Sequence, residues 1–165
     1  MKKLLFLFSF LYISYSVPAQ NIEDKWKLFA VTEGEEVYID TTGIKQIDNP
    51  ETGTFRYRVS SKKIYTEAQA KEKYLGKIEI ALSKTEKKQS KIQKKMKKWE
   101  DFQYTIIEYI YDCANRRYKI AVITDYNSKN KKIVTTKTSK NSPWVNIIGN
   151  DVADLMLFHV CDSEQ

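Results

Sequence analysis

Apolar and polar residues alternate along most of the chain, which is the pattern of β-strands with one buried face. In residues 54–65, Tyr57 and Val59 alternate with Arg56 and Arg58, as expected for a half-buried antiparallel strand. The same alternation, interrupted by short turn sequences, predicts six strands. They cover residues 25–31, 36–40, 54–65, 103–113, 117–126 and 131–138.

A long segment between the third and fourth predicted strands follows a helical period instead. Residues 66–101 are rich in good helix formers, and Thr66 and Gln69 are spaced as in a capping box. At 100° per residue the apolar side chains form one narrow stripe: Tyr74, Ile78, Ala81, Ile92, Met96 and Trp99. The constant phase favours one long helix over two, but Gly76 and a strand-like alternation leave a break near residues 76–83 open.

The last apolar segment predicts a C-terminal helix. Asn150 is a suitable N-cap, and Asp151 in the first turn would interact favourably with the helix dipole. Residues 152–160 are apolar on nearly all sides, so we expect the helix to be buried on several sides, in a concave face of the sheet. We expect His159, the sole histidine, to be buried and hydrogen-bonded there. The predicted fold class is therefore α+β.

The first nineteen residues have the pattern of a secretory signal peptide. Two lysines precede an uncharged apolar run at 4–15, and small residues follow before Gln20. This run is too short to span a bilayer, which takes about 20 apolar residues, and no cysteine follows it to carry a lipid. We expect an exported protein, whether periplasmic, at the cell surface or secreted. Residues 20–165 are expected to form a single domain that includes the helical insertion 66–101.

Export changes the expected role of the two cysteines. Cys113 ends the fourth predicted strand, and Cys161 follows the last helix. In an oxidising compartment such a pair is expected to form a disulfide. Zinc is not expected, because two thiolates and one histidine cannot complete a four-ligand site without carboxylates. We therefore expect a Cys113–Cys161 disulfide that ties the last helix to the sheet.

The net charge of +7 is concentrated in one segment. Residues 66–101 contain eleven lysines and six acidic residues, a net of +5. On a single helix, seven of these lysines would form an arc beside the apolar stripe. This lysine set is Lys84, Lys87, Lys88, Lys91, Lys94, Lys95 and Lys98. It is a candidate face for anionic ligands, but a solvated face that only keeps the protein soluble is favoured. Nucleic acid is not an expected partner of an exported protein.

No arrangement of residues indicates catalysis. Asp40, Asp112 and Asp125 end predicted strands, where carboxylates commonly accept hydrogen bonds from turns. His159 has no recognisable nucleophile or orienting acid to work with. We expect no enzymatic activity, no catalytic residue, no cofactor and no metal site.

Several short stretches resemble the surface-adhesin protein E family of Gram-negative envelope proteins. They are the Trp26 strand, "VYID" with Ile44 behind it, "YIYDC" ending in Cys113, Tyr126, and "PWVNIIGNDVADLMLFHVC" ending in Cys161. The resemblance implies a six-stranded antiparallel sheet with a C-terminal helix tied to its concave side by the disulfide. It also implies adhesion to the host extracellular matrix and, for some members, association as dimers.

Two functions are compatible with these features. We expect an exported, non-enzymatic binding module that contacts host matrix or cell-surface glycoproteins. The alternative is a periplasmic or envelope-associated structural module whose lysine-rich helix contacts anionic polymers or lipid head groups. Contact with a membrane would be peripheral at most, and homodimer formation is left open.

Overall fold

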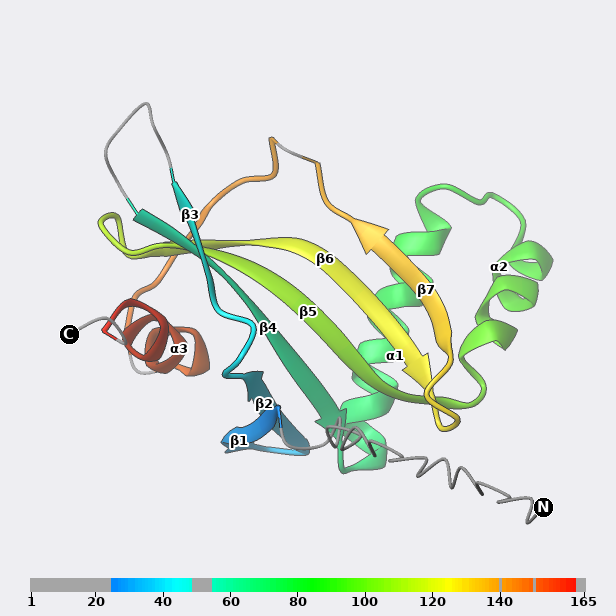
Figure 1. Ribbon diagram of the computed structural model, residues 1–165. Helices are drawn as coiled ribbons and strands as arrows, with labels where there is room; N and C mark the ends of the chain where they lie inside the picture. Colours follow the sequence, from blue (N-terminus) through cyan, green and yellow to red (C-terminus); the bar gives the residue numbers. More distant parts are fainter. Residues whose placement is uncertain (1–24, 49–54, 140, 150, 163–165) are drawn as a thin grey trace, which may run out of the picture.

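The computed structural model describes residues 25–48, 55–139, 141–149 and 151–162, so the predicted signal peptide lies outside the described residues. The described strands form one antiparallel sheet in the order β1-β2-β4-β5-β6-β7, with β3 beside β4 and β8 beside β6 (Figure 1). They are β1 Trp26–Thr32, β2 Glu35–Asp40, β3 Lys45–Asp48, β4 Phe55–Tyr65, β5 Phe102–Asp112, β6 Arg117–Asn127, β7 Lys132–Lys137 and β8 Val145–Asn146. The predicted α+β fold and its six-stranded path are confirmed, whereas β3 and β8 were not predicted.

The helices divide the sheet into a covered and an open face. On β4, Tyr57, Val59 and Tyr65 belong to one face, and Lys62 and Ile64 belong to the other, because successive side chains of a strand alternate. Helix α3, Val152–Cys161, packs against the Tyr57 side, and helix α1, Ala68–Ser83, packs near Tyr65. We call this the covered face. No described helix packs on the opposite, open face.

Two apolar clusters hold the helices on the covered face. At one end, Met156, Leu157 and Val160 of α3 pack with Val59 and Tyr111 of the sheet, and all five are at most 3% exposed. At the other end, α1, α2 (Gln89–Met96) and η1 (Lys97–Trp99) cover the ends of β4 and β5. Burying each large apolar side chain contributes about 1.5–3 kcal/mol, so each cluster is sufficient to fix its helices.

The helical insertion contains two helices and a short 3₁₀ turn. Of the two possibilities left open, one helix or two, the structure has two, and the break falls at residues 84–88, beyond the 76–83 region. Ser83 and Thr85 donate their side-chain hydroxyls to the carbonyls of Ile80 and Leu82, which lets the chain leave the helix.

Helix α2 then folds back on α1, with Gln89 and Gln93 each donating to Glu79 Oε1 at 3.3 Å. The start of the insertion also differs from the prediction. The N-cap of α1 is Glu67 rather than Thr66, and its side chain makes no capping hydrogen bond.

The C-terminal helix is present as predicted, but its surroundings differ. Its N-cap is Asp151, which accepts a hydrogen bond from the Asp154 amide, whereas Asn150, the predicted N-cap, lies outside the described residues. Leu155 and Phe158 are about half exposed, and His159 is exposed with its ring 5.6 Å from the Phe29 ring. The expected burial of this helix on several sides, and of His159, is therefore wrong. A ten-residue helix lying on a sheet buries only the stripe that faces the sheet.

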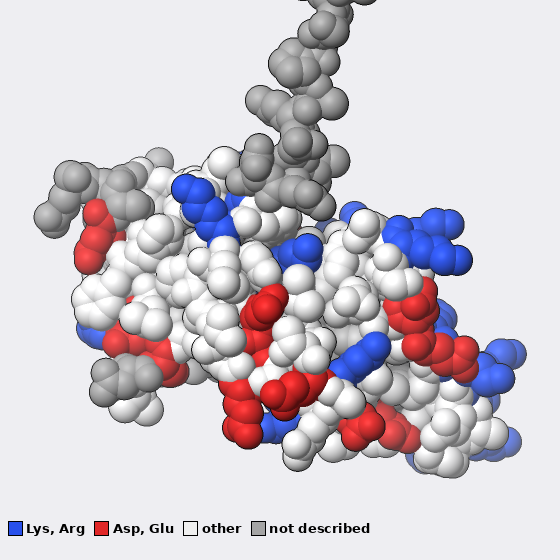
Figure 2. Space-filling view, turned by 90° about the horizontal axis from the view of Figure 1, so that it is seen from below, with Lys and Arg blue, Asp and Glu red and all other residues white. Residues whose placement is uncertain are grey.

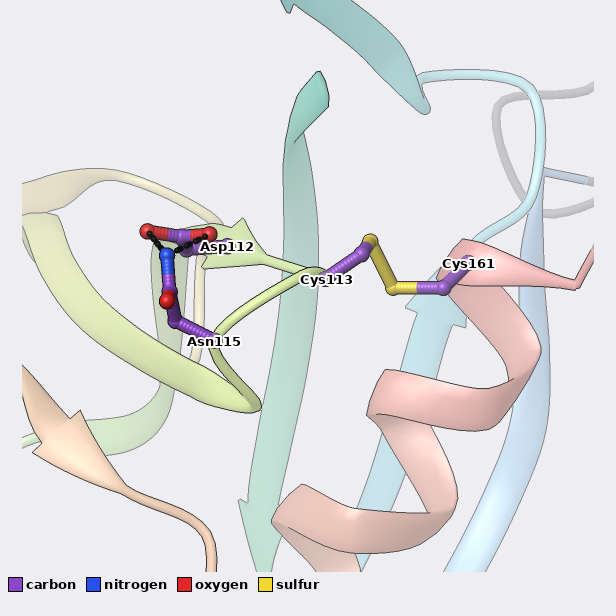
Figure 3. Close-up of a disulfide and its surroundings, with 4 residues drawn as sticks. All are labelled: Asp112, Cys113, Asn115 and Cys161. Carbon is purple, nitrogen blue, oxygen red and sulfur yellow. Dashed lines mark hydrogen bonds between the residues drawn. A yellow bond between two sulfur atoms is a disulfide. The ribbon is translucent and has the colours of Figure 1, made fainter. Parts of the chain in front are cut away.

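The disulfide joins the end of α3 to the sheet as predicted. Cys113 directly follows β5, Cys161 is the last residue of α3, and their Cα atoms are 5.9 Å apart. Figure 3 shows the bond crossing from the turn after β5 to the helix. The bond closes a loop with a sequence separation of 48 residues.

Candidate functional site

The lysine set is spread over three elements and a turn. Lys84 caps the C-terminus of α1, Lys87 lies in the turn, Lys88 caps the N-terminus of α2, and Lys91, Lys94 and Lys95 belong to α2 and Lys98 to η1. All are exposed except Lys95, which is half-buried and paired with Glu86. The hydrogen bond from Lys95 lowers the pKa of the Glu86 carboxyl. The single helical arc predicted for the lysine set is therefore wrong.

The charge around the helical insertion is mixed. In Figure 2, Lys and Arg side chains lie along the edge where Figure 1 places α1 and α2, and acidic side chains lie among them. Beside the start of α1, Glu33, Glu35 and Glu67 line one shallow depression together with Lys73. Opposite charges within a Debye length of about 8–10 Å weaken each other's attraction for a distant anion. Ligand binding by the lysine set stays a prediction.

A small cavity lies on the covered face beside α3. It has a volume of about 150 Å³, and its walls include Ser61 and three tyrosines in mutual ring contact, Tyr109, Tyr111 and Tyr118. Among the residues that the structure describes, the buried Ser61 Oγ has no hydrogen-bond partner of ordinary geometry, although it interacts electrostatically with the Tyr109 phenol. Burial raises the pKa of Tyr109 to about 12. Because small-molecule pockets usually measure about 300–1,000 Å³, this cavity is smaller than a typical ligand site.

The open face carries a larger groove, of about 570 Å³. It crosses β1, β2, β4 and β5 and ends at the turn after β6. Its lining residues are Trp26, Tyr38, Lys62, Ile64, Tyr104, Ile106 and Asn130. Aromatic side chains that combine an apolar ring with a polar tip are enriched where proteins bind partners. The size and lining of the groove therefore suit ligand binding.

Contacts between the groove residues hold the aromatic rings in fixed positions. Tyr104 stacks on Tyr126 with centroids 4.9 Å apart, and the Lys62 ammonium lies 4.6 Å from the Tyr104 ring centroid. The Tyr104 hydroxyl donates to Asn130 Oδ1 at 3.2 Å. Burial raises the pKa of both Tyr104 and Tyr126, so both phenols stay protonated at neutral pH. A ligand would meet rings that are already ordered, which lowers the entropy cost of binding.

The family model described as Surface-adhesin protein E matches residues 26–162. The chain belongs to this family. The matched region begins at the first residue of β1 and ends one residue after Cys161. Searches of curated proteins and of solved structures found no match.

The surface-adhesin protein E family suggests an exported binding protein rather than an enzyme. None of the described helices is long and apolar enough to span a membrane. In the described part of this adhesin E protein, no three His, Cys, Asp or Glu side chains are arranged to hold a metal ion. The elements matched by the family include every strand that forms the open-face groove.

The groove of this adhesin E protein was not predicted from its sequence. Its residues come from separate strands, and only the registers of β1 with β2, β2 with β4 and β4 with β5 bring them to one place. Alternation within β4 assigns Lys62 and Ile64 to one face, but it does not say which strands lie beside them. The alternation within each strand therefore predicts which side chains share a face, but it does not predict the groove.

The three aspartates at strand ends have different roles in this adhesin E fold. Asp40 accepts from the backbone and hydroxyl of Thr42 at 3.2 and 2.9 Å, which caps a turn as expected. Asp112 accepts from Asn115 in the turn after β5 (Figure 3) and from Arg117 at 2.8 and 2.9 Å. Asp125 instead points into the covered face, where it holds the helical insertion.

Replacing Asp112 with asparagine should destabilise the protein and reduce its sensitivity to acid. Although burial alone would raise the pKa of this carboxyl, hydrogen bonds from Arg117 and Asn115 outweigh burial and lower it. The ionised carboxylate therefore stabilises the fold fully above about pH 5, and this contribution is lost as the pH falls below about 4. We expect Asp112→Asn to cost about 2 kcal/mol at pH 7, less than a fully buried pair because the Arg117 side chain is 30% exposed.

Urea unfolding at pH 7 and pH 3 measures both effects. Asp101→Asn, which removes an exposed carboxylate that accepts from Ser128, is the control and should change stability by less than about 1 kcal/mol. Parallel loss of stability in wild type and Asp112→Asn on acidification would contradict the assignment.

Proposed function

We propose that this protein is an exported, non-enzymatic binding module that contacts host matrix or cell-surface glycoproteins through the open-face groove. The observation that carries the proposal is a groove of about 570 Å³ whose aromatic rings lie on a sheet face that no described helix covers. Membership in the surface-adhesin protein E family supports the binding role. The proposed compartment is the cell surface or the medium outside it.

The composition of the groove favours a polar macromolecule over a small apolar ligand. Lys62, Asn130 and the phenols offer hydrogen-bond donors, while Trp26, Ile64 and Ile106 supply apolar area. Interfaces of this kind depend on a few aromatic and cationic side chains, each worth about 2 kcal/mol or more. We expect Trp26 and Lys62 to contribute most of the binding free energy. Trp26 lies on the edge strand β1, and Lys62 lies near the middle of the groove.

Removing the Trp26 ring should weaken binding to matrix glycoproteins. We expect Trp26→Ala to raise the Kd for an immobilised matrix glycoprotein by about tenfold or more, since a buried aromatic anchor is worth about 2 kcal/mol. Surface plasmon resonance against a panel of purified matrix glycoproteins, with serum albumin as the non-matrix reference, measures the change. Leu28→Ala is the matched control, because Leu28 lies on the same edge strand, is 56% exposed and does not line the groove.

The alternative function, contact of the lysine set with anionic polymers or lipid head groups in the envelope, makes the opposite prediction. Its support is the exposure of Lys84, Lys87, Lys88 and Lys91 around one turn. Reversing these four to Glu would abolish binding if the lysine set is the site, and would leave it unchanged if the groove is. Lys95 should be kept, because its reversal would place two carboxylates side by side at Glu86. Unchanged binding by Trp26→Ala together with loss on lysine reversal would refute the groove.

A further inference from the structure

Three cations surround one indole ring at the far end of the open face. The ring of Trp144 has the Arg117 guanidinium carbon at 4.7 Å from its centroid, the Lys119 ammonium at 4.9 Å and the Arg56 guanidinium carbon at 5.2 Å. We call these four residues the Trp144 cluster. Cation–π attraction to the ring holds each positive charge in place. None of these residues lines the groove described above.

Strand pairing builds the Trp144 cluster. Asp112 of β5 lies between Arg56 of β4 and Arg117 of β6 in the registers of these strands. Strand β8 pairs with the same part of β6, and Val145 lies opposite Tyr118. The preceding residue, Trp144, therefore lies beside Lys119, the next residue of β6. The cluster therefore combines residues of β4 and β6 with the residue before β8, and it lies on the open face.

Two of the three cations of the cluster share one carboxylate, that of Asp112. Asp112 is the carboxylate of this group, it is fully buried, and its short contacts go to Arg117 and Asn115. Arg56 Nε is buried 3.9 Å from Asp112 and has no hydrogen-bond partner among the described residues. Among the described residues, these three cations and Asp112 together carry a formal charge of +2. The Arg56 and Arg117 side chains remain 28% and 30% exposed, and guanidinium groups suit sulfate and carboxylate groups, to which they donate N–H hydrogen bonds.

The open face continues the positive charge from the cluster to the groove. On β4, β5 and β6 it has five cationic positions and two acidic ones: Arg56, Arg58, Lys62, Arg117 and Lys119 against Glu108 and Asp112. Arg56 and Lys62 are six residues apart on β4, which corresponds to about 20 Å along the strand. Each end of this path pairs aromatic rings with cations, at Trp144 and at Tyr104. Such spacing suits an extended polymer with repeated negative groups better than a single small anion.

We propose that the open face binds a sulfated polysaccharide, with the Trp144 cluster holding a sulfate group and the indole ring packing against a sugar ring. This inference rests on the proposed function and names the part of a matrix or cell-surface glycoprotein that is recognised. The lysine set, by contrast, lies on the helical insertion, and none of its members makes a cation–π contact with a described aromatic ring. The polysaccharide therefore runs along β4, from the Trp144 cluster to the groove.

Isothermal titration with a heparin dodecasaccharide tests the proposal. Wild type should bind, and added salt should weaken binding because the attraction is electrostatic. Arg56→Gln with Lys119→Gln should raise the Kd about tenfold or more, since two charge-assisted contacts are lost. Lys84→Gln with Lys87→Gln removes the same charge from the lysine set and should leave the Kd within about twofold of wild type. Equal weakening by both pairs, or a larger effect of the lysine pair, would overturn the proposal.

Two further experiments test whether sulfate is the group that is recognised, and whether this inference can fail while the proposed function holds. A fully desulfated dodecasaccharide and vesicles containing phosphatidylserine should both bind at least about tenfold more weakly than heparin, and binding as tight as heparin by either would refute sulfate recognition. Should Arg56→Gln disturb the fold, Arg58→Gln with Lys119→Gln leaves Asp112 and its partners intact and should still weaken heparin binding. Absence of heparin binding, with Trp26-dependent binding to matrix glycoproteins retained, would overturn this inference alone.

Discussion

Replacing Cys113 with serine should lower the free energy of unfolding by about 4 kcal/mol under oxidising conditions. The disulfide closes a loop with a separation of 48 residues, and a loop of this length loses about that much chain entropy in the unfolded state. Domains of this size have a net stability of about 5–15 kcal/mol, so the change removes a large part of it. Helix α3 should separate from the sheet first, because its remaining attachments include one apolar stripe and the partly exposed Arg116–Asp154 ion pair.

Urea denaturation with and without dithiothreitol measures this contribution. The reductant should destabilise wild type by a similar amount and have no effect on Cys113→Ser with Cys161→Ser. A wild-type midpoint that does not move on reduction, after thiol titration has confirmed that both cysteines are free, would contradict the expected result.

Replacing Asp125 with alanine should have a comparable effect and should release the helical insertion. The carboxylate is 2% exposed and accepts three hydrogen bonds: from the Tyr74 hydroxyl of α1 at 2.7 Å, the Trp99 indole of η1 at 2.7 Å and the Thr105 hydroxyl of β5 at 3.0 Å. Alanine leaves these buried donors unpaired, at about 1–3 kcal/mol each and with incomplete additivity. We expect a loss of about 3–5 kcal/mol.

Two other aspartate variants give the matched comparison. Asp125→Asn keeps the shape and one acceptor for the Trp99 indole N–H, while its NH2 group would face the Tyr74 and Thr105 hydroxyls, which would have to turn and accept. Because the charge-assisted hydrogen bonds are lost, we expect an intermediate loss of about 2 kcal/mol. Asp101→Ala removes an exposed carboxylate and should cost less than about 1 kcal/mol. Hydrogen exchange should show faster exchange in α1 and α2 for Asp125→Ala alone. Equal stability of Asp125→Ala and Asp101→Ala would refute the role of Asp125.

The strands of the main sheet were predictable because each encodes its own half-buried face. Alternation such as that of Tyr57 and Val59 with Arg56 and Arg58 reports burial without knowledge of neighbours. Strands β3 and β8 were missed because they have four and two residues, too few to show a period. They exist because β4 and β6 offer them free edges.

In the helical insertion, the apolar stripe was identified correctly, but it favoured one helix where the structure has two helices and a 3₁₀ turn. The apolar stripe kept its phase across the break, so Tyr74 and Trp99 were expected on one helix, whereas α1 and η1 bring them to the same carboxylate of Asp125 from two directions. The carboxylate comes from β6, and no local pattern could include it. His159 was misplaced for a related reason: apolar neighbours in the sequence do not show which side of a short helix meets the sheet.

The sequence by itself determined the main strands, the final helix and the joining of Cys113 to Cys161, since periodicity and an even cysteine count are properties of the chain alone. Only the tertiary structure decided where β4 meets its neighbours, and hence the groove at Trp26 and Lys62 and the three cations around Trp144. The physical reason is that a strand pattern specifies a face, while a binding surface depends on the register between strands. The energy that sets register comes from contacts between residues far apart in the chain.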